Sequence, residues 1–226
     1  MTLDSIFPGV YNIRENGSDI IATLNLTPGR QVYNEKLVTI NGSEYRAWTP
    51  YRSKLSAAIK NGLKTLQVNQ GDLVLYLGVA SGTTCSHISD IVGNTGHIWG
   101  LDFAFRSLRD FINNVARYRG NLSPILGDAR RPETYADKVL GVDAIYMDVA
   151  QPNQADIAVK NAAHFLKPGG HLLMALKSRS IDVTVSPRKI YEEQVDILRS
   201  VFEINEILEL NPYEKDHAFV TATYQG

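Results

Sequence analysis

The spacing of hydrophobic residues changes along the chain, and this change predicts two structural regions. Up to about residue 50, short runs rich in apolar and β-branched residues are separated by turn signals such as Asn16-Gly17-Ser18, Thr27-Pro28-Gly29 and Asn41-Gly42-Ser43. Runs of this kind predict strands of a small antiparallel sheet at 10–13, 20–24 and 36–40. We therefore expect a small N-terminal β domain over residues 1–50, with a role in packing and partner docking, and a second domain over residues 51–226.

The second region alternates strand-length apolar runs with stretches of helical periodicity. The pattern predicts strands at 73–77, 97–101, 122–126, 144–147 and 171–176, and helices at 53–61, 84–92, 104–118, 154–165 and 187–202. This alternation predicts right-handed crossovers and a mostly parallel, Rossmann-like sheet with helices on both faces. Two consecutive strand patterns, at 203–210 and 218–224, predict a terminal antiparallel hairpin. We therefore expect an α/β fold with a seven-stranded sheet, the architecture of class I methyltransferases.

Composition narrows the class of protein without identifying it. The 226 residues are 44% hydrophobic and 21% charged, as in an ordinary globular protein. No apolar run approaches the roughly 20 residues that span a bilayer, and the N-terminus lacks the features of a secretory signal. The single cysteine, Cys85, excludes an internal disulfide and favours a cytoplasmic location, and the histidines show no metal-ligand spacing. We therefore expect no membrane contact and no metal.

The net charge of −1 bears on nucleic-acid binding. Proteins that hold nucleic acid unaided usually carry a positive excess, because contacts to phosphate dominate their affinity. A protein of this charge that acted on nucleic acid would need partners to hold it.

A glycine-flanked turn follows the first strand of the second region. The apolar run 73–77 is followed by Gly78, Gly82 and a helical pattern that opens at Thr84. Glycines allow a ligand to approach the backbone, and the first amides of a helix donate hydrogen bonds, so this arrangement is typical of nucleotide-like ligands. The spacing is neither that of a dinucleotide fingerprint nor that of a phosphate-binding loop. The turn alone predicts only a site for an adenosine-like molecule.

Charged residues follow the other strands, where ligands bind in open α/β sheets. Asp102, Asp128 and Asp148 follow the second, third and fourth strands, and Lys177 follows the fifth. A single aspartate at such a position often only caps a turn or helix. Together with the turn at Gly78, however, three carboxylates suit a ligand with ribose hydroxyls, an adenine amine and a positive centre. S-adenosylmethionine has all three features.

Four motifs carry a resemblance to a known family: Gly78-Val79-Ala80-Ser81-Gly82-Thr83-Thr84, Asp128-Ala129-Arg130, Asp148-Val149-Ala150-Gln151-Pro152 and Asp216-His217-Ala218. From about Trp48 to Tyr224 the chain resembles fibrillarin, the RNA 2′-O-methyltransferase of box C/D ribonucleoproteins. It lacks a glycine/arginine-rich N-terminal segment and so resembles the archaeal form. Asp102 is a departure, because many members carry Glu there; the shorter carboxylate is expected to preserve ribose binding.

The resemblance implies roles for individual residues. It implies a cofactor site formed by Gly78, Ala80, Ser81, Gly82, Thr83, Thr84, Asp102, Phe103, Asp128, Ala129, Asp148, Val149, Ala150 and Gln151. In this site Thr83 and Thr84 line the methionine end, Asp102 and Phe103 hold the ribose, Asp128 and Ala129 meet the adenine, and 148–151 border the sulfonium and the target.

The resemblance also implies a catalytic tetrad of Lys54, Asp148, Lys177 and His217. Without it, Lys54 would be read as a solvated helix lysine and His217 as a structural histidine. A ribose hydroxyl is a poor nucleophile, so the reaction needs a base. Lys177 is our candidate for that base; Asp148 would orient its amine, and His217 would complete the network.

Basic residues for RNA are sparse. Arg52, Arg130 and Arg131 are the candidates for contact with an RNA backbone, whereas Arg106, Arg109 and Arg117 fit a solvated helix face. The resemblance implies that a box C/D guide RNA, a Nop-type scaffold protein and a kink-turn-binding protein deliver the rRNA or tRNA target. Two alternatives remain from the sequence alone: an assembly subunit with a vestigial cofactor site, and a methyltransferase that acts on small molecules.

Overall fold

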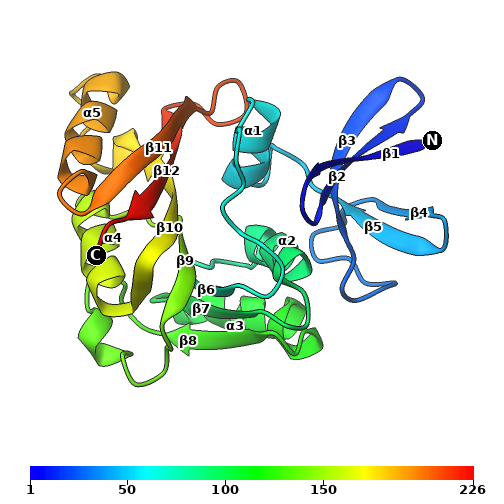
Figure 1. The fold of residues 1–226 in the computed structure, drawn as a ribbon, viewed down its shortest axis with the longest axis horizontal. Helices are drawn as coiled ribbons and strands as arrows, with labels where there is room; N and C mark the ends of the chain where they lie inside the picture. The colour runs from blue at the N-terminus through cyan, green and yellow to red at the C-terminus, as the bar shows by residue number, and fades with distance from the viewer.

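The computed structural model describes residues 1–226 and contains two separate β-sheets (Figure 1). The smaller sheet is antiparallel, has the strand order β1-β2-β3-β5-β4, and comprises β1 (Thr2–Phe7), β2 (Val10–Glu15), β3 (Ser18–Leu24), β4 (Leu37–Ile40) and β5 (Ser43–Ala47). Alternating side chains on one face of it form a small core of Ile13, Ala22, Val38 and Tyr45.

The larger sheet has seven strands in the order β11-β12-β10-β9-β6-β7-β8. Its strands are β6 (Leu73–Leu77), β7 (His97–Asp102), β8 (Leu122–Leu126), β9 (Val142–Met147), β10 (Leu166–Lys177), β11 (Phe202–Glu209) and β12 (His217–Tyr224). The five strands from β10 to β8 are parallel, and β12 runs antiparallel to both β10 and β11. The predicted class I methyltransferase fold, with its terminal hairpin and its additional N-terminal sheet, is confirmed.

Helices cover both faces of the large sheet. The helices are α1 (Lys54–Lys60), α2 (Thr83–Val92), α3 (Phe105–Asn114), α4 (Gln154–Phe165) and α5 (Pro187–Leu198), with single turns of 3-10 helix at Ala116–Tyr118, Pro132–Thr134 and Ser178–Ser180. Side chains of α1, α2 and α3 belong to one hydrophobic core, which we call the first core, and those of α4 and α5 to a second core across the sheet. In Figure 1, α4 and α5 lie to the left of the sheet and α1 to its right. None of these helices is long and apolar enough to cross a membrane.

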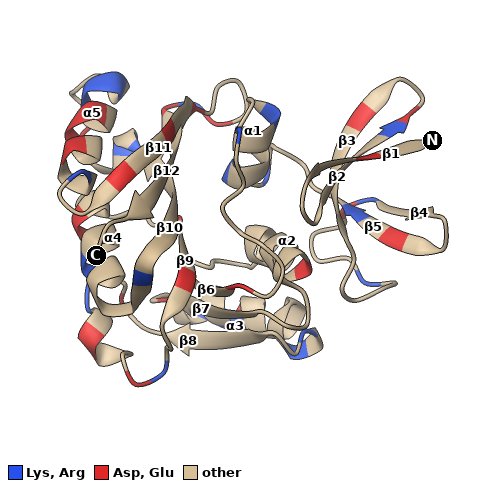
Figure 2. Ribbon diagram, viewed as in Figure 1, with Lys and Arg blue, Asp and Glu red and all other residues tan.

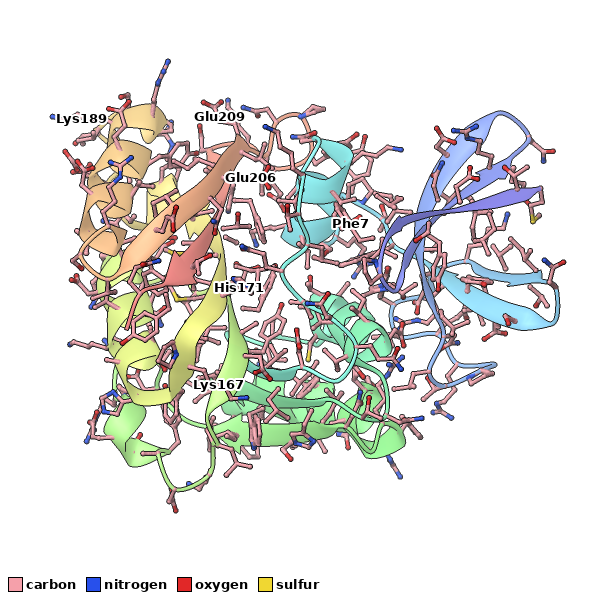
Figure 3. All side chains as sticks on the ribbon, viewed as in Figure 1. Phe7, Lys167, His171, Lys189, Glu206 and Glu209 are labelled. Atoms are coloured by element: carbon pink, nitrogen blue, oxygen red, sulfur yellow. The ribbon has the colours of Figure 1, made fainter.

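Buried charges attach the small sheet to the large domain. Arg46 of β5 is fully buried, and its guanidinium pairs with Glu35 at 2.7 Å and with Asp90 of α2 at 2.9 Å. Arg119 approaches the other oxygen of Asp90 at 2.6 Å. Phe7 also packs against the first core and lies between the two parts of the molecule in Figure 3. Because the Arg46 pair joins β5 to α2 and Phe7 packs on the first core, the small sheet is held in a fixed place beside α2.

The segment between α1 and β6 is fixed to the edge strand of the large sheet. The carboxylate of Glu206 accepts hydrogen bonds from the backbone amides of Lys64 and Thr65. Figure 3 shows Glu206 and Glu209 on β11. These bonds hold the chain that leads out of α1, so they help to fix α1 over the hairpin.

Several elements differ from their predicted bounds. Strands β1 and β5 are absent from the sequence prediction: β1 exposes most of its side chains, and β5 places a charged residue, Arg46, where a core residue is expected. The helix predicted at 104–118 breaks after Asn114 into a short 3-10 turn, and the one predicted at 187–202 ends at Leu198. Strand β10 begins at Leu166, before an irregularity in its pairing with β9.

Candidate active site

The turn after β6 brings two strand ends into close contact. Gly78 has φ +82°, and a Cβ atom at this position would lie 2.3 Å from the carbonyl oxygen of Asp148. The amide of Asp148 donates in turn to the carbonyl of Leu77 at 2.9 Å. A side chain at position 78 would separate the end of β6 from the end of β9, so glycine is required for this approach.

A cavity of about 270 Å³ opens at this edge of the sheet. Its walls are Gly78, Ala80, Leu101, Asp102, Phe103, Ala104, Ser107, Ala129, Asp148, Val149, Ala150 and Gln151. The cavity lies beyond the carboxyl ends of parallel strands, where ligands bind in folds of this type. The structure thus brings together nine of the residues expected from the sequence at a cofactor site, and Phe103 is 68% exposed at its rim.

Asp102 forms part of the cavity wall and also organises it. One carboxylate oxygen accepts from the amide of Ala80 at 2.9 Å, and the other accepts from the amide of Ala104 at 2.8 Å. The side chain therefore links the turn after β6 to the start of α3. Because a carboxylate oxygen has two lone pairs, each oxygen can still accept a bond from a ligand hydroxyl.

Five expected residues do not line the cavity: Ser81, Gly82, Thr83, Thr84 and Asp128. The threonine at 84 is buried, and its hydroxyl donates to Ser53 Oγ at 2.9 Å. A Cβ at Gly82 would lie 2.5 Å from the ring of Phe111, so that glycine is needed for helix packing. The carboxylate of Asp128 faces the guanidinium of Arg130 at 2.6 Å.

The cofactor site predicted from the sequence does not include three residues of the cavity wall: Leu101, Ala104 and Ser107. Leu101 lies inside an apolar strand and carries no polar signal. Ala104 and Ser107 are three residues apart at the start of α3, so they lie on the same side of its first turn. That helical spacing next to Asp102 is the signal that could have located them.

Lys54 and Asp148 form an ion pair at the edge of the cavity. Lys54 Nζ lies 2.7 Å and 3.0 Å from the two carboxylate oxygens, and the side chains are 19% and 28% exposed. Asp148 follows the last residue of β9, and Tyr146, two positions earlier, belongs to the first core. Because side chains alternate along a strand, Asp148 projects toward α1.

The helix that carries Lys54 is held at its first turn. Ser53 is its N-cap and accepts from the amide of Ser56 at 3.3 Å. The bond from Thr84 to Ser53 ties this cap to the first turn of α2. These two contacts fix where Lys54 starts relative to the glycine turn.

Lys177 and His217 are opposite each other on neighbouring strands. They are paired residues of the antiparallel β10 and β12. Leu173 and Ala175 of β10 and Phe219 of β12 all belong to the first core, and alternation places Lys177 and His217 on that same side. All four tetrad residues therefore lie on the α1 side of one sheet edge.

The rings and backbones around this pair are also fixed. His217 is buried, and its Nδ1–H donates to the carbonyl of Lys215 at 2.8 Å, which leaves Nε2 free to act as an acceptor in the neutral ring. Gln154 is fully buried at the start of α4 and forms two hydrogen bonds to the backbone of Lys177. Its Oε1 accepts from the backbone amide of Lys177 at 3.0 Å, and its Nε2 donates to the backbone carbonyl of Lys177 at 3.1 Å. The sequence alone did not predict this role for Gln154.

Two buried tyrosines lie beneath the ion pair. The rings of Tyr76 and Tyr146 are 4.5 Å apart, and burial raises the pKa of both phenols well above the usual value. Both hydroxyls are therefore neutral at physiological pH and add no negative charge beside the carboxylate of Asp148.

The three arginines expected to contact RNA differ in whether their guanidinium groups already lie beside a carboxylate. Arg130 pairs with Asp128, and Arg131 lies 3.4 Å from Glu133, so both are already next to a carboxylate. Arg52 is exposed, with its guanidinium 5.5 Å from the ring centre of Tyr33. In Figure 2, basic and acidic residues are interspersed over the view rather than gathered in one patch. No group of three or more histidine, cysteine or acidic side chains could hold a metal ion.

Comparison with known proteins identifies the family to which this chain is similar over nearly its whole length. Residues 2–226 match the family described as Fibrillarin. The fibrillarin-like rRNA/tRNA 2′-O-methyltransferase of Aeropyrum pernix is 52% identical over 216 residues, which cover 95% of this chain and 92% of that protein.

Solved structures of fibrillarins are also similar to this chain. The crystal structure of Aeropyrum pernix fibrillarin with natively bound S-adenosyl-L-methionine has a TM-score of 0.92 at 50% identity and covers 98% of each chain. A structure of a fibrillarin/Nop5p complex has a TM-score of 0.88 at 36% identity and covers 99% of this chain and 100% of that one. The chain belongs to the fibrillarin family.

Proposed function

We propose that the protein is an S-adenosylmethionine-dependent ribose 2′-O-methyltransferase that acts on rRNA or tRNA under the direction of a box C/D guide RNA. The observation that carries this proposal is the Lys54–Asp148 ion pair at the edge of the cavity, on the same side of the sheet as Lys177 and His217. The match to fibrillarin-like rRNA/tRNA 2′-O-methyltransferases supports it.

The cavity suits S-adenosylmethionine in shape and in chemistry. The missing side chain at Gly78 leaves the backbone open to a ligand, and Asp102 offers acceptors for ribose hydroxyls. Ala129 and Val149 supply apolar walls for the adenine, and Asp148 places a carboxylate near the site of a sulfonium. We propose that Ser81, Gly82, Thr83, Thr84 and Asp128 shape this site from outside the cavity walls, or reach the methionine and adenine ends of the cofactor.

The bound cofactor supplies an electrophilic methyl group, and the residues of the chain position the acceptor and move its proton. The unprotonated amine of Lys177 takes the proton of the 2′-hydroxyl and ends as an ammonium ion. As the bond from the hydroxyl oxygen to the methyl carbon forms, the bond from that carbon to the sulfonium sulfur breaks, and its electron pair stays on the sulfur. Asp148 stabilises that new positive charge, and Lys54 fixes Asp148. His217 lies opposite Lys177 and completes the network. Alignment of the reacting groups supplies much of the rate.

Partners deliver the RNA. The net charge of −1 and the paired state of Arg130 and Arg131 leave little free positive charge to hold RNA tightly. We therefore propose that a Nop-type scaffold protein, a guide RNA and a kink-turn-binding protein present the target; the similar fibrillarin/Nop5p structure supports the first of these. We also propose residues 1–50 and 51–226 as the two domains, with the smaller one available for docking.

Transfer of tritium from labelled S-adenosylmethionine tests the proposal. In a complex reconstituted with scaffold protein, kink-turn-binding protein and guide, we expect label in a complementary RNA and none when the guide is omitted. Labelling that needs no guide, or labelling of small molecules alone, would overturn the guided function. Calorimetry that finds no cofactor binding at millimolar concentration would support a docking subunit with a vestigial site.

A further inference from the structure

Two tyrosines form an aromatic pair next to the candidate catalytic residues. The ring centroids of Tyr51 and Tyr213 are 5.2 Å apart, with the ring planes at 74°. Tyr213 is half-buried and packs against the first core, whereas Tyr51 is 68% exposed. Tyr213 therefore serves as a fixed support, and Tyr51 presents ring surface to solvent.

The pair is close to the site in sequence and in space. Tyr51 precedes Lys54 by three residues, so their Cα atoms lie within about 10 Å of each other. Tyr213 lies in the turn between β11 and β12, four residues before His217. The pair thus joins the segment that brings Lys54 to the site with the segment that brings His217.

The turn that supports Tyr213 is well anchored. The amide of Tyr213 donates to the carbonyl of Leu210 at 2.9 Å. At the C-cap of α1, Asn61 donates through its side chain to the carbonyls of Glu209 and Asn211, at 2.9 Å and 2.8 Å. Because α1 and the turn are tied together, the orientation of the aromatic pair is set before any ligand arrives.

The surroundings of Tyr51 favour a nucleic acid over a protein. Arg52 is exposed and directly follows it, whereas the ammonium group of Lys54 is already paired with Asp148. Apart from Tyr51, which precedes α1, no large hydrophobic side chain of α1 or of the turn before His217 is exposed. The core of a protein–protein interface usually contains a cluster of apolar residues. A lone aromatic ring beside cations is instead typical of sites where a base or sugar stacks and a phosphate is neutralised.

We propose that Tyr51, supported by Tyr213, is the platform on which a nucleotide of the target strand packs beside the ribose that receives the methyl group. This inference rests on the proposed function, because it takes the ligand to be RNA. It assigns to Tyr51 a positioning role: the ring fixes the strand, and the strand carries the 2′-hydroxyl to Lys177. Tyr51 does not touch the reacting atoms.

Steady-state kinetics of the reconstituted guide complex test this role. In Tyr51→Ala we expect KM for the target RNA to rise about 5- to 100-fold, the range for loss of one stacked aromatic contact. Tyr51→Phe keeps the ring, so its KM should stay within about twofold of that of the unmodified protein. The Kd for S-adenosylmethionine should be unchanged in both variants. Tyr118→Ala is the matched control, because that tyrosine is also exposed. It follows α3 and lies beside β8, at the far end of the strand order from β11.

A second measurement needs no methyl transfer. A 2-aminopurine is placed in the target strand next to the acceptor nucleotide, and its fluorescence is measured in the complex. We expect weaker fluorescence with the unmodified protein and with Tyr51→Phe than with Tyr51→Ala, since stacking on the ring quenches the probe. This readout separates the two proposals: an inactive but quenched complex contradicts the proposed function alone.

Two results would overturn the platform. One is equal fluorescence and equal KM in the unmodified protein and Tyr51→Ala while the Tyr118 control also behaves normally. The other is a Tyr51→Ala protein that binds the scaffold protein at least tenfold more weakly in calorimetry without RNA, which would assign the ring to a protein interface.

Discussion

Lys54 Nζ lies 2.7 Å and 3.0 Å from the two carboxylate oxygens of Asp148, so a single ammonium group bonds to both oxygens across 94 residues of sequence. The contact joins the first turn of α1 to the end of β9. It holds a carboxylate at the edge of the cofactor cavity with a fixed orientation. Lys177, at the end of the neighbouring strand, has no carboxylate partner among the ion pairs of the structure.

Replacement of Lys177 should separate catalysis from cofactor binding. In Lys177→Ala we expect methyl transfer to fall at least about 100-fold, because positioned bases contribute on that scale. Lys177→Arg should be equally slow, since a guanidinium does not release its proton at physiological pH. The Kd for S-adenosylmethionine should change less than threefold, because Lys177 does not line the cavity. Initial rates and calorimetry measure both quantities. Full activity in Lys177→Ala would remove this residue as the base.

Loss of the Gln154 side-chain amide should disturb the backbone of Lys177. Gln154→Leu is similar in size but removes the bonds to the amide and carbonyl of Lys177. We expect kcat to fall at least tenfold with KM for RNA and Kd for cofactor nearly unchanged. Gln194→Leu is the control, because Gln194 binds the backbone of Ala155 on the same helix without touching Lys177. Equal kcat values in the two variants would show that the clamp has no role in catalysis.

The charge cluster around Asp90 should dominate stability. Asp90 is a fully buried carboxylate between two buried guanidinium groups, Arg46 and Arg119. Asp90→Asn leaves those positive charges without their shared partner, so we expect the free energy of unfolding to fall by about 3–5 kcal/mol. Asp110→Asn breaks an exposed pair with Arg109 and should cost less than about 1 kcal/mol. Urea unfolding followed by circular dichroism compares the two. Equal losses would contradict the buried-charge account.

Stability should fall between pH 7.5 and 5.5. Burial lowers the pKa of His87, His97 and His171 below the usual value of about 6.5. Below pH 6.5 the unfolded chain therefore binds more protons than the folded protein, and the free energy of unfolding decreases as the pH falls, by at most about 1.4 kcal/mol per pH unit for each histidine. Urea midpoints across this range measure the slope. The double variant His97→Asn/His171→Asn should show a shallower slope; an unchanged or rising stability at pH 5.5 would contradict the assignment.

Residues at the ends of parallel strands were predictable from the sequence. The hydrophobic pattern locates each strand, and parallel topology brings all the carboxyl ends to one edge. Asp102, Asp148 and Lys177 could therefore be assigned to one edge of the sheet; of the three, Asp102 and Asp148 line the cavity there and Lys177 does not. The pairing of Lys54 with Asp148 required the family resemblance, because nothing in the pattern of helix α1 distinguishes Lys54 from a solvated lysine.

Long-range polar contacts were not predictable. Arg46 is buried because Asp90 and Glu35 surround it, and residues distant in sequence give no local sign of such a cluster. Thr84 turns to Ser53 instead of the cavity for the same reason. Gln154 and Tyr51 are also defined by distant partners, Lys177 and Tyr213. Periodicity reports which face of an element is buried, but it does not report which polar groups meet there.

The most direct test of the proposed activity is to map the methylated ribose with two guides. Two complexes are assembled with guide RNAs whose pairing to the same target differs by one nucleotide, and the 2′-O-methyl group is located by its resistance to alkaline cleavage. We expect one methylated ribose in each case, displaced by one nucleotide with the guide, and none with Asp148→Asn. A methyl group on a base, or at a position that does not move with the guide, would contradict it.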